Sequence, residues 1–162
     1  MSKEVRHYEN NTFIAAPPEK VFDYADDHKN FSSHMNQSSW MMGGGRMETQ
    51  VDEGLGQKVG SHIRMSGKVF GVEVSLDEVV IKHEPPYLKA WETVGSPKLL
   101  VIGNYQMVLE IKPENSNSNL KVSIDYEIPE SPKTRWLGDL FGGVYAKWCV
   151  SQMINGVKTH FG

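Results

Sequence analysis

The sequence predicts an α+β fold in which a curved antiparallel sheet of about seven strands wraps around one long C-terminal helix, with two short helices after the first strand. Two observations lead to this class. Between about residues 46 and 128, apolar and polar residues alternate in successive stretches separated by short turn segments, which is the pattern of half-buried strands. Residues 134–160 instead carry apolar residues at helical spacing. The connections between strands are too short for parallel crossovers, so the strands form a meander.

The N-terminal part of the chain predicts one strand followed by the two short helices. The strand is expected over residues 7–15 and ends at Pro17. Pro18 suits the first position of a helix, because its backbone angle is already helical and no needed hydrogen-bond donor is lost there. A second short helix is expected to begin at Asp26 and Asp27, whose side chains can cap it, and to reach about Phe31.

Six further strands follow. In residues 120–128 every second residue from Leu120 to Ile128 is apolar, so one face of this strand is buried. In residues 69–82 the alternation breaks near residues 77–80, where a β-bulge would explain the change. The polar segment 113–119 predicts a surface loop between two strands. The expected strands cover residues 47–51, 59–68, 69–82, 87–94, 99–112 and 120–128.

The long helix over residues 134–160 carries two apolar faces. We expect the first face to close a cavity against the sheet, and the second to pack under the short helices or to form a homodimer contact. Gly142 and Gly143 each cost roughly 1 kcal/mol of helix stability relative to alanine, and they permit either a kink or a close backbone contact. The first face comprises Leu137, Leu140, Phe141, Val144 and Trp148, and the second comprises Trp136, Val150, Met153 and Ile154.

Composition indicates one domain spanning residues 1–162, with 39% hydrophobic and 23% charged residues. A net charge of −3 and scattered basic residues argue against nucleic acid as a partner, since that requires a basic patch. No apolar stretch is long enough to span a membrane, and the polar start of the chain is unlike a secretory signal. The single cysteine, Cys149, suits a reducing compartment, so we expect a cytoplasmic protein.

Two segments carry a resemblance to a known superfamily. The first is the run Ile14–Asp27, which reads Ile-Ala-Ala-Pro-Pro-Glu-Lys-Val-Phe-Asp-Tyr-Ala-Asp-Asp, and the second is Tyr145–Cys149 in the terminal helix. With the order of strands, they make the chain similar to the START/Bet v 1-like (SRPBCC) superfamily, the helix-grip proteins that include polyketide cyclases and lipid carriers. The resemblance implies a hydrophobic or amphipathic molecule, lipid-like or aromatic, in a central cavity, with cyclisation, dehydration or hydrolysis in some members. It implies no catalytic residue, because the superfamily has no universal catalytic motif.

Strand parity and the first helix face predict which residues line the cavity. Several are methionines, whose flexible side chains adapt to irregular shapes. The alternative is that the same side chains fill a solid core. The predicted ligand-binding residues are Met47, Met65, Trp91, Tyr105, Met107, Tyr126, Leu137, Phe141, Val144 and Trp148.

Four polar residues are candidates for catalysis: His34, Arg64, Glu92 and Tyr105. Arg64 and Tyr105 could bind a carboxylate or polarise a carbonyl, and His34 with a carboxylate could perform acid–base chemistry near neutral pH. The alternative for His34, Arg64 and Glu92 is a solvated surface position. Strand parity also places Glu92 opposite Trp91, so only one of the two faces inward.

We expect neither a metal nor a cofactor. The six histidines show no ligand spacing, a second cysteine is absent, and the glycines of residues 54–60 join two strands rather than a strand and a helix. Three functions stay open: a binder or carrier of a hydrophobic molecule, a cyclase, dehydratase or hydrolase acting on one, and a co-chaperone-like protein-interaction module.

Overall fold

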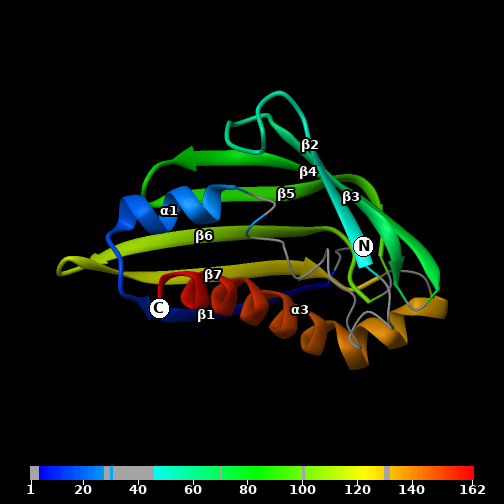
Figure 1. The fold of residues 1–162 in the computed structure, drawn as a ribbon. Coiled ribbons are helices and arrows are strands. Elements are labelled where there is room, and N and C mark those ends of the chain that lie inside the picture. The colour runs from blue at the N-terminus through cyan, green and yellow to red at the C-terminus, as the bar shows by residue number, and fades with distance from the viewer. Residues whose placement is uncertain (1–3, 28–29, 31–45, 70, 100, 130–131) are drawn as a thin grey trace.

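The computed structural model of the protein describes residues 4–27, 30, 46–69, 71–99, 101–129 and 132–162 (Figure 1). The seven strands form one antiparallel sheet in the order β1-β7-β6-β5-β4-β3-β2, so the predicted fold class is confirmed. The predicted second short helix falls largely outside the described residues. The elements are β1 (Val5–Ile14), α1 (Pro18–Asp26), β2 (Arg46–Val51), β3 (His62–Val69), β4 (Val72–Glu84), β5 (Leu88–Lys98), β6 (Tyr105–Glu114), β7 (Asn117–Glu127) and α3 (Pro132–Phe161).

Strand β7 shows how the sequence pattern becomes a sheet with one buried face. Leu120, Val122, Ile124 and Tyr126 are buried, and the residues between them are half-buried, as side chains that alternate across a strand require. Strand β1 pairs with β7 over its whole length, from Val5 opposite Glu127 to Ile14 opposite Ser118. The meander from β2 to β7 is therefore completed by the first strand of the chain.

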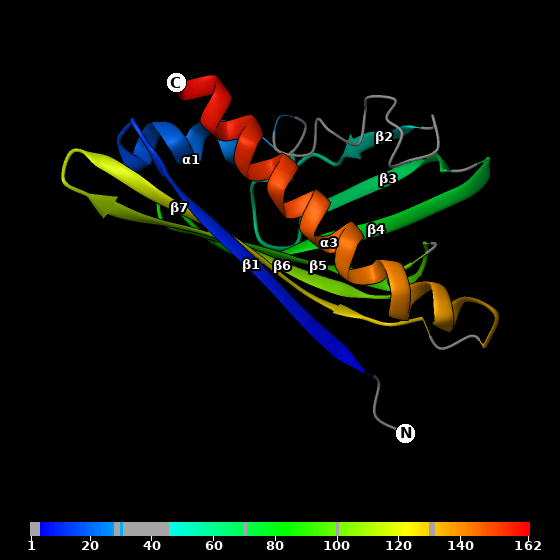
Figure 2. The ribbon, with the colours of Figure 1, turned by 90° about the horizontal axis from the view of Figure 1, so that it is seen from below.

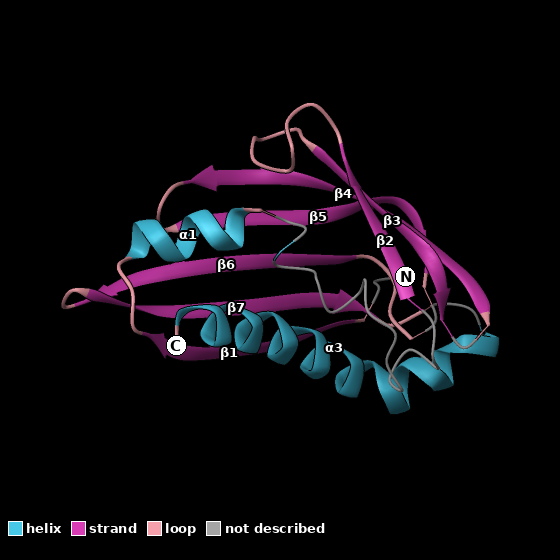
Figure 3. Ribbon diagram, in the orientation of Figure 1, coloured by secondary structure: helices cyan, strands magenta, loops and turns pink. Residues whose placement is uncertain are grey.

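Helices α1 and α3 lie on the concave face of the sheet (Figures 2 and 3). Helix α1 begins at Pro18 and buries Val21, Phe22 and Ala25 against the sheet. Helix α3 crosses β1 and β7, and its C-terminal end touches α1. There the ring of Tyr24 stacks on that of His160, with 3.8 Å between the ring centroids. The main core lies between these helices and the sheet.

The side of α3 that faces the sheet is not the one that the sequence pattern predicted. Buried positions follow one another at spacings of three and four, as on one face of a helix. The exposed residues Leu140, Phe141 and Val144 belong to the predicted cavity face, so that assignment is wrong for them. The buried residues are Gly138, Gly142, Ala146, Cys149, Val150, Met153, Ile154 and Val157.

The reason for the error is that the sheet-facing side of α3 begins with small residues. A Cβ atom at Gly138 would lie 2.6 Å from Pro129 Cδ and 3.0 Å from the carbonyl oxygen of Val101. A Cβ at Gly142 would lie 3.2 Å from that same oxygen. Helix α3 continues without interruption past both positions. The glycines therefore permit close contact between the helix and the chain beneath it.

The same burial corrects the predicted homodimer contact. Val150, Met153 and Ile154 are buried in the chain's own core together with residues of α1, so they are not available to a second copy, and the homodimer alternative is wrong for these three residues. Trp136 is exposed. Across the residue ranges given above, no helix is long and apolar enough to cross a membrane.

Candidate functional site

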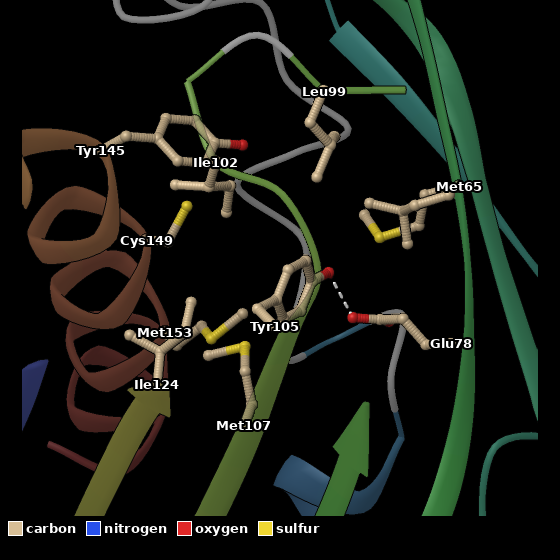
Figure 4. A pocket seen from close by; sticks show the side chains of 11 residues that line it. Met65, Glu78, Leu99, Ile102, Tyr105, Met107, Ile124, Tyr145, Cys149 and Met153 are labelled. Atoms are coloured by element: carbon tan, nitrogen blue, oxygen red, sulfur yellow. Dashed lines mark hydrogen bonds between the residues drawn. The ribbon is translucent and has the colours of Figure 1, made fainter. Parts of the chain in front are cut away.

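A small cavity lies between the concave face of the sheet and the middle of α3 (Figure 4). Its volume is about 30 Å³, which is room for one or two water molecules. Strands β3, β4, β6 and β7 form one wall and α3 forms the other, and Leu99 and Ile102, which lie between β5 and β6, close one side. The lining residues are Met65, Leu76, Glu78, Leu99, Ile102, Tyr105, Met107, Ile124, Tyr145, Cys149 and Met153.

The sheet wall of the cavity carries one pair of polar groups, Glu78 and Tyr105. The hydroxyl of Tyr105 donates a hydrogen bond to Oε2 of Glu78, and Glu78 is 2% exposed. Burial, followed by the charge of Glu78, raises the pKa of Tyr105 well above its usual value near 10. At neutral pH the phenol therefore keeps its proton and acts as a donor toward the carboxyl group.

Strand pairing brings these two residues together. Thr93 on β5 lies opposite Glu78 on β4, so both face the concave side. The hydroxyl of Thr93 accepts a hydrogen bond of 3.0 Å from the backbone N–H of Tyr105 and donates one of 2.8 Å to Asn104 Oδ1. Thr93 thus fixes the first residue of β6 beside Glu78, although β5 and β6 pair directly only from Leu88 to Glu92.

The helix wall contributes Tyr145 and Cys149, one turn apart. Burial raises the pKa of the Cys149 thiol to about 12, with a smaller opposing contribution from its hydrogen bond to Tyr145. Burial and the neighbouring Cys149 also raise the pKa of Tyr145 well above 10. Both groups are neutral near physiological pH, so this wall presents weak hydrogen-bonding groups rather than a nucleophilic thiolate.

A second buried polar cluster lies under the C-terminal end of α1, outside the cavity lining. Lys89 on β5 is fully buried, and its Nζ lies 3.0 Å from Asp26 Oδ1 and donates a 3.1 Å hydrogen bond to the backbone oxygen of Asp26. His83 Nε2 lies 2.9 Å from Asp26 Oδ2. Desolvation lowers the pKa of Lys89, and Asp26 partly offsets this. The cluster holds α1 onto β4 and β5.

The structure places three of the predicted ligand-binding residues, Met65, Tyr105 and Met107, on the cavity wall. Trp91 and Tyr126 face the concave side and are buried in the adjoining core. Leu137 and Trp148 are half-buried on α3, whereas Phe141 and Val144 are 49% and 51% exposed and lie outside the lining. The side chain of Met47 lies outside the described residues.

Of the three candidates for catalysis that the structure describes, Tyr105 alone lines the cavity. The side chain of Arg64 is 71% exposed and lies 3.9 Å from Asp77 on the outer face of the sheet. Trp91 is buried on the concave side, and Glu92 is half-buried on the opposite face. Of these two neighbours on one strand, Trp91 is therefore the one that faces inward. His34 lies outside the described residues.

Glu78 was not predicted, although the sequence contains a signal for it. Strand β4 keeps its period of two through the residue, with Val74, Leu76, Glu78 and Val80 all buried. The expected break near residues 77–80 therefore reflects an acidic side chain in an inward position. Register shifts of the kind that a β-bulge produces occur on both sides of this segment, between Ser75 and Asp77 and between Val80 and Lys82.

Comparisons with known proteins agree with this architecture. No curated protein sequence matches the chain. Among solved structures, the ZhuI aromatase/cyclase from Streptomyces sp. R1128 superposes with a TM-score of 0.73 at 12% identity, over 97% of this chain and 93% of that one. Norcoclaurine synthase from Thalictrum flavum gives 0.66 at 15% identity, over 98% and 87%. Ara h 8.0201 gives 0.65 at 10% identity, over 98% of both chains.

These identities are low, so the structural similarities establish the fold. The family follows from the sequence itself, because a profile described as polyketide cyclase / dehydrase and lipid transport matches residues 6–162. This range includes every residue of the cavity lining. The chain therefore belongs to the polyketide cyclase / dehydrase and lipid transport family.

Proposed function

We propose that this protein binds a hydrophobic or amphipathic small molecule between the sheet and α3, with the polar group of the ligand at Glu78 and Tyr105. The observation that carries the proposal is the buried carboxyl–phenol pair on an otherwise largely apolar wall. Sites for small molecules combine such apolar linings with a few polar groups that fix orientation. A ligand hydroxyl can donate to Glu78, and a ligand carbonyl can accept from Tyr105.

Ligand binding requires the cavity to widen. Its volume of about 30 Å³ is far below the roughly 300–1,000 Å³ of typical ligand pockets. Met65, Met107 and Met153 line it from three different elements. Their unbranched side chains have many accessible rotamers and can rearrange around a bound molecule. The cavity thus has an adaptable apolar wall and a polar pair whose position strand pairing fixes.

The test is native mass spectrometry of the purified protein, with solvent extraction of any retained molecule and titration of that molecule into the stripped protein. We expect one molecule per chain. Tyr105→Phe should raise the Kd about tenfold, the effect of losing one hydrogen bond of roughly 1.4 kcal/mol. Tyr126→Phe is the matched control, because Tyr126 is buried but does not line the cavity. Equal effects of the two variants would contradict the proposed site.

A second candidate is catalysis on such a molecule, as a cyclase or dehydratase. The Glu78–Tyr105 pair favours it, because a buried carboxyl group beside a phenol can accept a proton from carbon while the phenol donates to a developing oxyanion. Two similar structures also have enzyme names, aromatase/cyclase and synthase. Glu78→Gln should then abolish turnover while binding persists, whereas a pure carrier returns its ligand unchanged.

A cytoplasmic location and the absence of nucleic-acid partners remain predictions. The location rests on the single buried cysteine, and fractionation of cells that produce the protein would test it.

A further inference from the structure

A second hollow, of about 340 Å³, opens on the outer face of the sheet over β3, β4 and β5. Its rim is polar. Arg64 lies opposite Asp77 and Ser66 opposite Ser75 across the β3–β4 pair, and all four side chains line the hollow. Asp77 is held in place by His62, whose Nδ1 lies 3.0 Å from its carboxyl oxygens.

The hollow lies where the sheet is interrupted. Between the pairs Ser75–Lys98 and Asp77–Val94, strand β4 has one residue, Leu76, and β5 has three, residues 95–97. Gly95 has a positive φ of 70°, and Pro97 has no N–H to donate to the neighbouring strand. The pairing of β5 with β6 has already ended at Glu92. The sheet is therefore weakly connected on both sides of this part of β5.

Two residues line both the outer hollow and the inner cavity, Met65 and Leu76. They lie opposite each other on β3 and β4, and both are buried. They are thus the layer that separates the hollow from the cavity. One of the two is a methionine, which can change rotamer without moving the backbone.

We propose that an apolar ligand reaches the cavity through this interruption of the sheet, with the hollow as the mouth and with Met65 and Leu76 as the gate. The inference rests on the proposed function, because it assigns a route to the same cavity. The polar rim would hold the hydrophilic end of an amphipathic ligand while its apolar part passes between β4 and β5.

Chemical modification of Cys149 can report how readily a small molecule enters the cavity. Cys149 is the single cysteine of the chain and lines the cavity on the side of α3. Its thiolate displaces methanesulfinate from methyl methanethiosulfonate and gains a methylthio group. At mildly alkaline pH, the rate of this modification measures how often a small reagent reaches the cavity, whether or not the protein binds a ligand.

Two pairs of variants test the route. Leu76→Ala opens the gate, and Leu109→Ala is its control, because Leu109 is buried in the core but lines neither the cavity nor the hollow. Ser66→Trp fills the mouth from the outer face, and Ser123→Trp is its control on the outer face of β7. The second pair leaves the core intact, so the test survives if Leu76→Ala does not fold.

We expect Leu76→Ala to accelerate Cys149 modification about tenfold and Ser66→Trp to slow it about tenfold, each equal to about 1.4 kcal/mol of barrier. Both controls should stay near wild type. The association and dissociation rates of 1-N-phenylnaphthylamine, an uncharged fluorophore, should change in the same directions. If this probe binds but the variants match their controls, the route is wrong and the binding function stands. If access to Cys149 follows the gate but neither this probe nor an extracted molecule binds, the binding function fails instead.

Discussion

Among the described residues, the carboxyl groups of Asp26 and Glu78 are buried on the concave side of the sheet, and their surroundings differ. Asp26 lies between two basic side chains, Lys89 at 3.0 Å and His83 at 2.9 Å, at the end of a helix. Glu78 instead accepts a hydrogen bond from the neutral phenol of Tyr105 and lines a cavity. A buried acid with a basic side chain at each oxygen is held by its own fold. A buried acid beside a neutral donor and free volume can exchange that donor for a ligand group.

Removing the cation should have the largest effect. Lys89→Met leaves Asp26 buried without the ammonium group that lies 3.0 Å from it, and breaking a buried ion pair in this way destabilises proteins by roughly 3–5 kcal/mol. Urea unfolding followed by circular dichroism measures the loss. Adding Asp26→Asn to the variant should restore part of the stability, since the uncompensated charge is then gone. A loss no larger than that of an exposed lysine variant would contradict the structural role of this cluster.

Removing the phenol should cost less stability and change binding more. Tyr105→Phe withdraws one donor from Glu78, a loss of about 1–3 kcal/mol. The double variant Tyr105→Phe, Glu78→Leu should recover much of it, because the buried carboxyl group that lost its donor is then gone. Ligand affinity should not recover in the double variant. Equal recovery of stability and affinity would mean that the pair contributes only to folding.

Alkaline pH should affect the two regions in opposite directions. The raised pKa of Cys149, from 9.0 to about 12, means that the folded chain keeps a proton that the unfolded chain releases, so stability falls as pH rises through this range. The lowered pKa of Lys89 acts oppositely: its contribution grows as pH rises from that lowered pKa toward 10.5. Cys149→Ala should therefore flatten the alkaline loss of stability, and Lys89→Met should steepen it. Unfolding curves across the alkaline range measure both slopes.

The smallest effect is expected at the edge of the Asp26 cluster. The side-chain amide of Gln57 donates a long, 3.5 Å hydrogen bond to the backbone oxygen of Asp26, which also accepts from Lys89. Gln57→Ala should change stability by about 0.5 kcal/mol or less, as thermal unfolding can verify. A larger loss would show that the end of α1 depends on the loop as well as on the ion pairs.

Strands and their order could be predicted because each strand repeats one simple signal. Apolar residues alternate along β7 from Leu120 to Tyr126, and this alternation appears directly as burial. Burial of every second residue continues on β4 from Leu76 to Glu78. Because Glu78 is acidic, however, the sequence alone suggests that the alternation of apolar and polar residues ends there. Lys89 is similar, since it shares the inward side of β5 with Trp91. Functional or structural acids and bases inside a sheet contradict the very pattern that locates the strand.

The orientation of α3 could not be predicted for a different reason. Apolar content identifies a buried face only where large side chains fill the contact, as they do from Val150 to Val157. At Gly138 the helix approaches the chain so closely that a Cβ atom would lie 2.6 Å from Pro129 Cδ, and at Gly142 a Cβ atom would still be tightly placed, 3.2 Å from the carbonyl oxygen of Val101. In this part of α3, large apolar side chains such as those of Trp136 and Leu140 lie on the exposed side of the helix. The sequence signal for the sheet-facing side of α3 in this region was the pair of glycines four residues apart, Gly138 and Gly142.

The pairing of β1 with β7 has a consequence for how the chain folds during synthesis. Ile14 pairs with Ser118 and Val5 with Glu127, so β1, which is synthesised before the other strands of this sheet, must wait for β7, which is synthesised after them. Contacts between residues so distant in sequence form slowly, because a long loop must close before they stabilise the fold. Until then β1 exposes unpaired backbone groups, the feature by which strands associate with other chains. We expect a nascent chain ending before Asn117 to need the protection of a chaperone that the finished protein does not.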